Sequence, residues 1–408
     1  TYLSLFGCFI LIISPRFFAE GFYNSKDIIF MHSFIICTFF GLKFLKRPDL
    51  INSFFFALLS ALSANIRLVS LLIPVVIFYF IIIKFLRNDY KFSISFNVFI
   101  YLFFLFFLLI LFWPFLWTNP IDNFLYAFFT FKNYDIDLTN FYAGKYMSAQ
   151  IIDWYYLPLW IIVTTPFYIL FFFILNFLKT IQRVIKRMLV IDSKKKFNDL
   201  WRGNKELHTL IFFSFIFISI FSTIIFKSTL YNGWRHFYFI YPFIVILALS
   251  EIRTFFHLFK KLRKFLLLFL FVSIIFQINW MVVNHPHQNV YFNFIGGKKP
   301  HLNYEIDYWG LSNKYALIKI LSSKQKNEMV TVSNVSDTNL NENLLFSKIP
   351  NKKTIIYKDL LSYPDYVVDN NYFFSNKHKK KRKILKNYYV FDQLYVGDTL
   401  VTTIYKRK

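Results

Sequence analysis

Long apolar runs separated by short charged loops dominate the first 283 residues of the chain. A helix needs about 20 apolar residues to cross the hydrocarbon core of a bilayer. The pattern predicts nine hydrophobic segments, at 1–14, 28–45, 53–64, 68–85, 93–116, 155–178, 207–226, 236–252 and 265–283. The third is too short to cross alone, so it is either a half-helix or joined to its neighbour through the break at Asn65, Ile66 and Arg67.

The residues after 283 have a mixed pattern. Alternating apolar and polar residues predict strands at 328–335 and 353–357, and a hairpin of 387–393 with 399–405 around Gly397. We therefore expect an all-α polytopic membrane domain, residues 1–283, followed by a small α/β domain, residues 284–408. The basic run 377–383 (KHKKKRK) is interpreted as a solvated loop, in preference to a contact with anionic lipid.

Composition and charge support a membrane protein. The chain is 56% hydrophobic, which excludes an ordinary soluble domain over such long runs. A net charge of +25 could suggest nucleic acid, but its distribution argues against that partner. The alternating loops 43–52, 84–92, 179–206 and 253–264 hold 20 Lys and Arg, and the opposite short loops hold seven. The positive-inside rule places the lysine-rich loops in the cytoplasm and residues 284–408 on the outer face.

The cysteines and the chain start add two expectations. Cys8 and Cys37 both lie in apolar runs, so neither a disulfide framework nor a cysteine metal site is available. The chain begins at Thr1 inside an apolar segment, from which we expect that the natural N-terminus is missing.

Polar groups gather in the loops predicted to face outward. The turn 14–27 carries Glu20 and Asp27, together with Arg16 and Lys26. Its carboxylates could hold a divalent metal such as Mg²⁺ or Mn²⁺, with Asp27 as a ligand, or orient a sugar hydroxyl. The two cations could neutralise a lipid phosphate. The alternative is ordinary anchoring at the membrane interface.

Three further places are candidates. Arg67 lies between two apolar segments, where it either faces a cavity or snorkels to the interface, and we favour snorkelling. Arg235 and His236 stand at the mouth of a helix, where a guanidinium and an imidazole suit a phosphate group. The aromatic side chains of Trp154, Tyr155 and Tyr156 fit an interfacial belt, although one or two could stack on a sugar.

The segment after the last predicted helix is rich in polar and aromatic residues. His285 and His287 flank a single proline, a spacing that rarely makes a metal site alone. We expect residues 285–310, which include Glu305 and Asp307, to fold back and dock on the membrane domain. No Gly-rich phosphate loop, HExxH or CxxC motif occurs in the sequence.

At these residues the chain resembles the bacterial GT-C membrane glycosyltransferases related to protein O-mannosyltransferases and to the aminoarabinose lipid A transferase. The strings that carry the resemblance are SPRFFAEGFYNSKDIIF at 14–30, WYYLPLWIIVTTP at 154–166, LYNGWRHFYFIYP at 230–242, HPHQNVYFN at 285–293 and EIDYWGLS at 305–312. They occur in order along nearly the whole chain.

The resemblance implies an inverting glycosyltransferase of the bacterial inner membrane, acting on its outer face with a polyprenyl-phosphate sugar as donor. A glycan, lipid or protein would be the acceptor. Glu20 and Asp27 would be the acidic residues that help to bind metal or donor phosphate, and Arg235 would contact the phosphate. The family's catalytic carboxylate lies in its first outer loop, and this chain resembles the family from about the third helix on. The general base is therefore expected to lie outside this chain.

The leading hypothesis is transfer of a hexosyl or pentosyl group from a lipid-phosphate carrier. Catalytic carboxylates would be Asp27 and Glu20, and the substrate-binding residues would be Arg235, His236, Arg16, Arg67, Trp154, Tyr155 and Tyr156. The alternatives are a polytopic transporter or lipid flippase, a catalytically inactive relative, and an assembly protein whose basic outer domain binds an anionic polymer. A transporter should carry ionisable residues in helix centres and paired broken helices, of which we find few.

Overall fold

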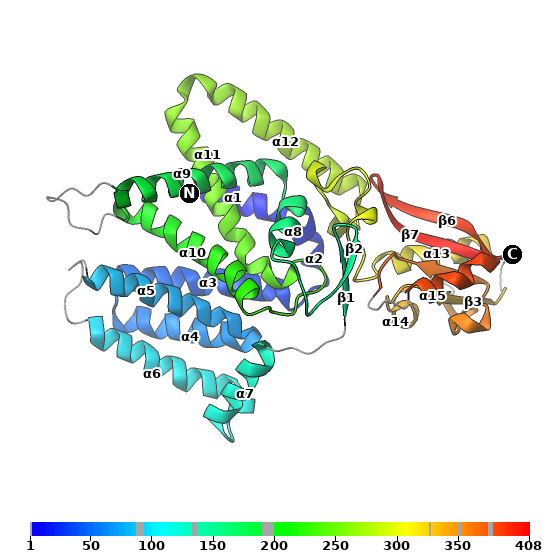
Figure 1. The fold of residues 1–408 in the computed structure, drawn as a ribbon, viewed down its shortest axis with the longest axis horizontal. Helices are drawn as coiled ribbons and strands as arrows, with labels where there is room; N and C mark the ends of the chain where they lie inside the picture. The colour runs from blue at the N-terminus through cyan, green and yellow to red at the C-terminus, as the bar shows by residue number, and fades with distance from the viewer. Residues whose placement is uncertain are drawn as a thin grey trace.

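The computed structural model describes residues 2–86, 94–132, 138–189, 200–325, 328–346, 348–349, 352–373 and 378–408. A large helical region comes first, and a small region built on a mixed sheet follows at one end of it (Figure 1). Most helices of the first region run side by side along the long axis of the molecule, and the two strands of the C-terminal hairpin extend from the end of the helical region toward the C-terminus at the far end (Figure 1).

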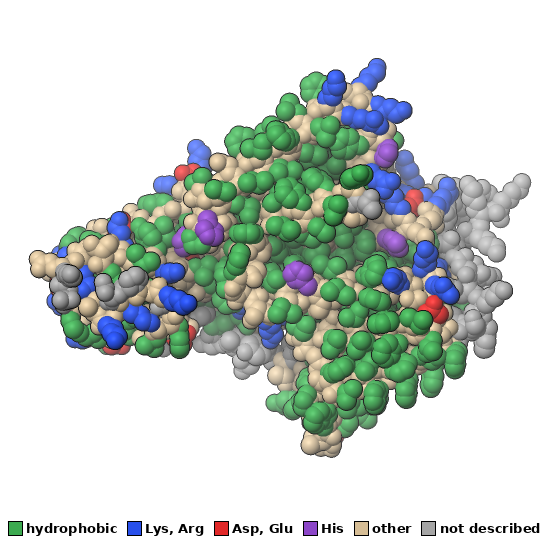
Figure 2. All heavy atoms as spheres, turned by 180° about the vertical axis from the view of Figure 1, so that it is seen from behind, with side chains coloured by type: hydrophobic (Ala, Val, Ile, Leu, Met, Phe, Trp, Pro, Cys, Tyr) green, Lys and Arg blue, Asp and Glu red, His purple; other side chains and the backbone are tan. Residues whose placement is uncertain are grey.

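Six helical segments among the described residues are long and apolar enough to cross a membrane. They are Asp27–Lys46, Leu68–Leu86, Phe167–Leu189, Gly203–Ile225, Arg235–Leu258 and Lys260–Val283. Three shorter apolar helices accompany them, Tyr2–Ile12, Leu50–Ile66 and Phe96–Phe112. Hydrophobic side chains cover the middle of the helical region (Figure 2), as expected where hydrocarbon is the solvent and every backbone group must be bonded within a helix. The prediction of a helical membrane protein is confirmed at this level.

In chain order, the helices are α1 (Tyr2–Ile12), α2 (Pro15–Glu20), α3 (Asp27–Lys46), α4 (Leu50–Ile66), α5 (Leu72–Leu86), α6 (Ile94–Phe112), α7 (Pro120–Lys132), α8 (Tyr156–Thr164), α9 (Phe167–Leu189), α10 (Gly203–Ile225), α11 (Tyr241–Leu258) and α12 (Arg263–Val283). The 3-10 turns η1 (Leu68–Leu71) and η3 (Arg235–Ile240) lead directly into α5 and α11.

Three predicted segments differ from the structure. The segment 93–116 is α6, which ends at Phe112 and is followed by the 3-10 turn Pro114–Leu116. The segment 155–178 is two helices, α8 and α9, because the residue before a proline is restricted to extended backbone and Thr165 precedes Pro166. The short third segment is an independent helix, α4, whose first turn is capped by the Asp49 carboxylate, which accepts from the Asn52 N–H at 2.9 Å. It ends where Arg67 turns to extended backbone.

The connection between α6 and α8 has structure that the sequence pattern did not predict. It contains α7 and a hairpin of β1 (Thr139–Tyr142) and β2 (Lys145–Ser148). Both turn residues of this hairpin, Ala143 and Gly144, have positive φ, as a tight turn with the favoured twist requires.

The C-terminal region holds a five-stranded sheet in the order β4-β3-β5-β7-β6. Its strands are β3 (Val330–Asn334), β4 (Ile355–Tyr357), β5 (Tyr366–Asp369), β6 (Tyr388–Val396) and β7 (Thr399–Arg407), with β3 parallel to both β4 and β5. Helices α13 (Ser312–Ser323), α14 (Leu340–Phe346) and α15 (His378–Lys383) accompany the sheet. The predicted hairpin around Gly397 and the predicted strands β3 and β4 are confirmed; β5 was not predicted.

The interpretation of the basic run as a solvated loop is wrong for its described part. Residues His378–Lys383 form α15, and Lys377 lies outside the described residues. Lys381 pairs with Asp337 at 2.5 Å, and Arg382 pairs with the buried Asp369 at 2.9 Å. A carboxylate of strand β5 and one in the loop after β3 thus pair with this cationic segment.

Candidate functional site

The turn between α2 and α3 brings two carboxylates together. Pro15 opens α2, where a missing N–H costs nothing, and the turn after Glu20 ends at Asp27, the first residue of α3. The Asn24 amide nitrogen donates to Glu20 Oε2 at 2.7 Å and to Asp27 Oδ2 at 3.0 Å, and its oxygen accepts from the Asp27 N–H at 2.9 Å. One side-chain amide therefore sets the positions of both carboxylates.

Glu20 is buried and surrounded by hydrogen-bond donors. The Tyr308 hydroxyl donates to Oε1 at 2.7 Å, and the Trp309 indole N–H lies 3.2 Å from both carboxylate oxygens. Burial raises the pKa of Glu20 above its ordinary value, although the hydrogen bonds from Tyr308, Asn24 and Trp309 act against that rise. The side chain is thus held by partners from a segment almost 290 residues away in the sequence.

Asp27 lies between two guanidinium groups. Arg67, at the break between α4 and η1, forms an ion pair and hydrogen bond with Asp27 Oδ1. Arg235, at the start of η3, approaches Asp27 Oδ2 to 3.9 Å. Asp27 is 2% exposed and the arginine side chains are 14% and 15% exposed, so solvent screens these pairs only weakly. The interpretation of Arg67 as a snorkelling residue is wrong, because its head group is paired inside the protein.

A third arginine lies on the same helix as Glu20. Arg16 donates its Nε–H to the Tyr291 carbonyl at 3.0 Å, and its guanidinium lies over the ring of Phe292 at 4.7 Å. It stands four residues before Glu20 in α2, a spacing that places both side chains on one face of the helix. We refer to Glu20, Asp27, Arg16, Arg67 and Arg235 together as the arginine cluster.

Each arginine of the cluster has one buried nitrogen that makes no hydrogen bond among the described residues. The Nη2 atom of Arg16 and the Nε atoms of Arg67 and Arg235 are buried and have no hydrogen-bond partner among the described residues. A buried donor without a partner costs about 1–3 kcal/mol, and more when it is charged. Two of these guanidinium groups, those of Arg67 and Arg235, lie beside Asp27, and the third lies on the helix of Glu20, whose pKa burial raises. The cluster has both the charge and the donors to receive an anion.

Aromatic side chains orient Arg235. Its guanidinium lies 5.2 Å from the ring centroid of Tyr231 and 5.0 Å from that of Trp309, and contact with two aromatic rings favours a cation at this position. His236 is half-buried with its ring packed edge-on to Tyr231 at 4.7 Å. The site thus includes the predicted Arg235, and His236 lies at its edge.

The loop that carries Arg235 is held from both sides. The Tyr156 hydroxyl donates to the Gly233 carbonyl at 3.0 Å, and the Gly233 N–H donates to Glu305 at 2.5 Å. Burial raises the pKa of Glu305 to about 7, against the opposing effects of the Gly233 N–H, Arg235 and Arg16. Glu305 is in turn fixed by its own N–H, which donates to the Phe141 carbonyl at 2.8 Å.

The structure separates the three predicted aromatic residues. Tyr156 is buried and positions the Arg235 loop, as described above. Trp154 is 68% exposed, and its ring packs against Tyr155, whose ring also approaches Tyr142. Within the described part of the chain, no contact links Trp154 or Tyr155 to the arginine cluster. The structure therefore gives no support to these two as substrate-binding residues.

Several side chains of the site were not among the predicted site residues. Tyr308, Trp309, Tyr238 and Asn24 all bond to Glu20, Tyr238 through its hydroxyl at 3.3 Å. Tyr308 and Trp309 belong to the polar and aromatic segment 285–310, for which the sequence predicted only docking on the membrane domain. It does dock, since Asn293 donates to the carbonyls of Ile162 and Thr165 at 2.6 and 2.7 Å, and it also completes the site.

The predicted divalent metal does not fit the side chains as they are placed. Among the described residues, no group of three His, Cys, Asp or Glu side chains is close enough to hold a metal ion. The oxygens of Glu20 and Asp27 already accept from Tyr308, Trp309, Asn24 and Arg67, and a cation would have to displace the guanidinium beside Asp27. The donor set is suited to an anion instead.

Comparison with known proteins adds no further assignment. No family model, no curated protein and no solved structure matches the chain.

Proposed function

We propose that this chain is a membrane glycosyltransferase that moves a sugar from a polyprenyl-phosphate carrier to an acceptor on the outer face of the membrane. The observation that carries the proposal is the set of buried, unused guanidinium donors in the arginine cluster, next to helices that are apolar enough to lie in a bilayer. A phosphate on a long hydrocarbon chain presents its charge at such a boundary. The resemblance of the sequence to the GT-C glycosyltransferases points to the same substrate.

In this reaction, negative charge develops on the phosphate that leaves the sugar. When the acceptor oxygen attacks the anomeric carbon, the bond between that carbon and the phosphate oxygen breaks, and negative charge grows on the departing phosphate. Arg235, Arg67 and Arg16 would stabilise that charge through preorganised donors in a weakly screened site. Bidentate contact between a guanidinium and phosphate oxygens would also fix the orientation of the donor.

The two carboxylates take a different role from the predicted one. Asp27 is paired with Arg67 and flanked by Arg235, and Glu20 is bonded by Tyr308, Trp309 and Asn24. Each would act as a positioning residue that holds donors toward the phosphate. The proton of the acceptor hydroxyl would pass to an oxygen of the departing phosphate, so neither carboxylate takes it, and no step runs through a metal.

The orientation of the chain in the membrane is part of the proposal. The cytoplasmic side would be the end at which α3 finishes with Lys43 and Lys46 and α9 finishes with Lys186 and Arg187. That end lies away from the C-terminal sheet (Figure 1). The positive-inside rule then places the arginine cluster and the sheet on the outer face, which in a bacterium is the outer face of the inner membrane.

The proposal is tested by transfer from a radiolabelled polyprenyl-phosphate sugar with the protein in membranes. Wild type is compared with Arg235→Gln and with Arg253→Gln, an exposed arginine near the other end of the same helical segment. We expect transfer by wild type and by Arg253→Gln, and strong loss in Arg235→Gln. Absence of transfer by wild type from each of several donor sugars, with the lipid phosphate still bound, would instead favour a carrier or an inactive relative.

A further inference from the structure

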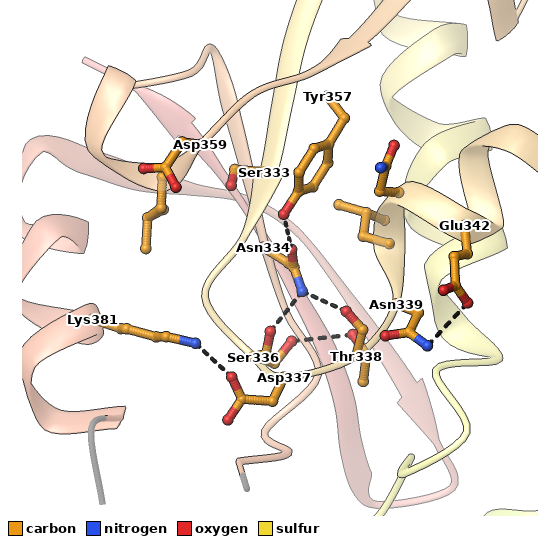
Figure 3. Close-up of a pocket in the computed structure, with 13 residues that line it drawn as sticks. Ser333, Asn334, Ser336, Asp337, Thr338, Asn339, Glu342, Tyr357, Asp359 and Lys381 are labelled. Carbon is orange, nitrogen blue, oxygen red and sulfur yellow. Dashed lines mark hydrogen bonds and ion pairs between the residues drawn. The ribbon is translucent and has the colours of Figure 1, made fainter. Parts of the chain in front are cut away.

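A cavity separate from the arginine cluster opens in the C-terminal region. Its volume is about 470 Å³, within the range of roughly 300–1,000 Å³ typical of ligand pockets. It lies at the carboxyl ends of the parallel strands β3 and β4, where Asn334 and Tyr357 face each other (Figure 3). From β3 the chain goes to β4 on one side and then to β5 on the other. Ligands of open α/β sheets bind at such reversals of strand order.

The walls of this cavity are held in place by side-chain amides. Asn334 donates to the carbonyls of Ser336 and Thr338, both at 2.6 Å, and accepts from the Tyr357 hydroxyl at 3.0 Å (Figure 3). The hydroxyls of Ser336 and Thr338 contact the buried Asn370 oxygen at 3.0 and 2.9 Å. The loop after β3 is therefore rigid without a ligand, which reduces the entropy lost on binding.

The charged groups that line the cavity are mostly carboxylates. Asp337, Asp359 and Glu342 contribute three carboxylates, against the single ammonium of Lys381, which is paired with Asp337. Ser333 is among the residues that line the cavity and is 1% exposed, and its buried Oγ atom has no hydrogen-bond partner in the described part of the chain. The cavity is thus acidic in a chain whose net charge is +25, and it holds a hydroxyl that nothing in the described fold uses.

We propose that this cavity binds a sugar residue, and that it prefers an amino sugar and rejects a sugar acid. Sugar hydroxyls and an ammonium group are donors that match the three carboxylates, whereas a carboxylate on the ligand would meet three like charges. The half-exposed ring of Tyr357 supplies an apolar wall for the C–H face of a pyranose. A metal ion is a poorer occupant, because no three ligating side chains converge among the described residues.

Binding is tested with the full chain in lipid nanodiscs free of glycoside detergents, by ligand-observed NMR and calorimetry. The probes are methyl glucoside, methyl glucosaminide and methyl glucuronide. We expect affinity to fall in the order glucosaminide, glucoside, glucuronide. Asp359→Asn, Glu342→Gln and Ser333→Val should each weaken glucosaminide binding, by about tenfold where a charged hydrogen bond is lost. Asp398→Asn, which changes an exposed carboxylate in the hairpin turn, should leave it unaltered.

Two results would overturn the proposal. One is the lack of saturable binding by any of the three sugars. The other is binding that the three pocket variants leave unchanged, because the sugar would then sit elsewhere. Circular dichroism and thermal unfolding of each variant show that the fold is intact. The transfer reaction is not part of this test, so its failure and the failure of sugar binding are separable.

Discussion

The arginine cluster and the C-terminal cavity are two polar sites of opposite sign. In the cluster, three guanidinium groups are buried among aromatic rings and keep unused donors. In the cavity, three carboxylates and a single lysine line an open space. The first suits an anion at the membrane boundary, and the second suits a hydroxyl-rich or cationic ligand in water.

The difference also concerns how each site is coupled to the fold. Asp27 is 2% exposed and its partner arginines are 14% and 15% exposed, so removing one charge leaves another uncompensated in a weakly solvated place. Asp359 is exposed and Glu342 likewise, so their charges are solvated whether or not a ligand is present. An anionic ligand that accepts from the unpaired guanidinium donors would therefore remove the free-energy penalty of burying them without partners.

The largest expected effect is on transfer, at Arg235. Arg235→Gln should lower the transfer rate by about 10²–10³, as for removal of one preorganised donor from a developing anion. Arg235→Lys keeps the charge but loses the planar fork, so it should recover only part of the rate. Radiolabel transfer in membranes measures both. Equal activity of the glutamine and lysine variants would show that charge at this position has no role.

The next effect is on stability, and it separates the two sites. Asp27→Asn should destabilise the protein by about 3–5 kcal/mol, because Arg67 is left buried without its counter-ion. The double variant with Arg67→Gln should recover part of that loss. Asp359→Asn should change stability by less than about 0.5 kcal/mol.

Thermal unfolding in detergent measures these changes. Asp49→Asn is the control within the helical region, because asparagine caps a helix as well as aspartate does. Similar unfolding temperatures for Asp27→Asn and Asp359→Asn would contradict the expectation that the fold depends on the charge of Asp27 and not on that of Asp359.

A third effect depends on pH and comes from Glu305. Its pKa is raised to about 7 by burial, above the ordinary value of 4.5, so the folded state favours the protonated form. The contribution of protonated Glu305 to the stability of the folded state is complete below about pH 4.5 and is lost as the pH rises through about 7. We expect a loss of about 3 kcal/mol across this window.

Glu305→Gln should abolish most of that dependence, because the amide oxygen still accepts from the Gly233 N–H while the charge is gone. The measurement is the apparent unfolding temperature at several pH values, with Asp398→Asn as an exposed control. Identical pH profiles for wild type and Glu305→Gln would rule out Glu305 as their source.

The smallest effect concerns the tryptophans. Trp309→Phe keeps a ring beside Arg235 but loses the N–H that bonds Glu20, and should weaken lipid-phosphate binding by a few-fold at most. Trp154→Ala should leave binding unchanged, because its ring is exposed and contacts Tyr155. A larger loss in Trp154→Ala than in Trp309→Phe would place the ligand nearer the aromatic belt than the cluster.

The apolar runs were enough to predict the helices, since crossing a bilayer requires length and hydrophobicity that local sequence records. The break at Pro166 was missed because hydropathy alone does not register a proline. The helix α15 was missed because a run of like charges is typical of a solvated loop, and its ion pairs with Asp337 and Asp369 are long-range.

The candidate site could be predicted only in part. Glu20 and Asp27 were singled out by their chemistry within one turn, and Arg235 by its place at a helix mouth. Their meeting with Arg67 depends on helix packing, and the contact of Trp309 with Glu20 joins positions that no local pattern connects. The residues that hold Glu20 and Asp27 in place come from distant segments of the chain, so the sequence of one turn does not reveal them.

The most direct test of the account compares binding of polyprenyl phosphate with binding of the uncharged polyprenol by the full chain in nanodiscs. The account predicts tight binding of the phosphate, weak binding of the alcohol, and about tenfold weaker phosphate binding in Arg235→Gln and in Arg67→Gln. Arg253→Gln should bind as wild type does. Equal affinity for the phosphate and the alcohol would contradict the claim that the arginine cluster receives a lipid-linked anion.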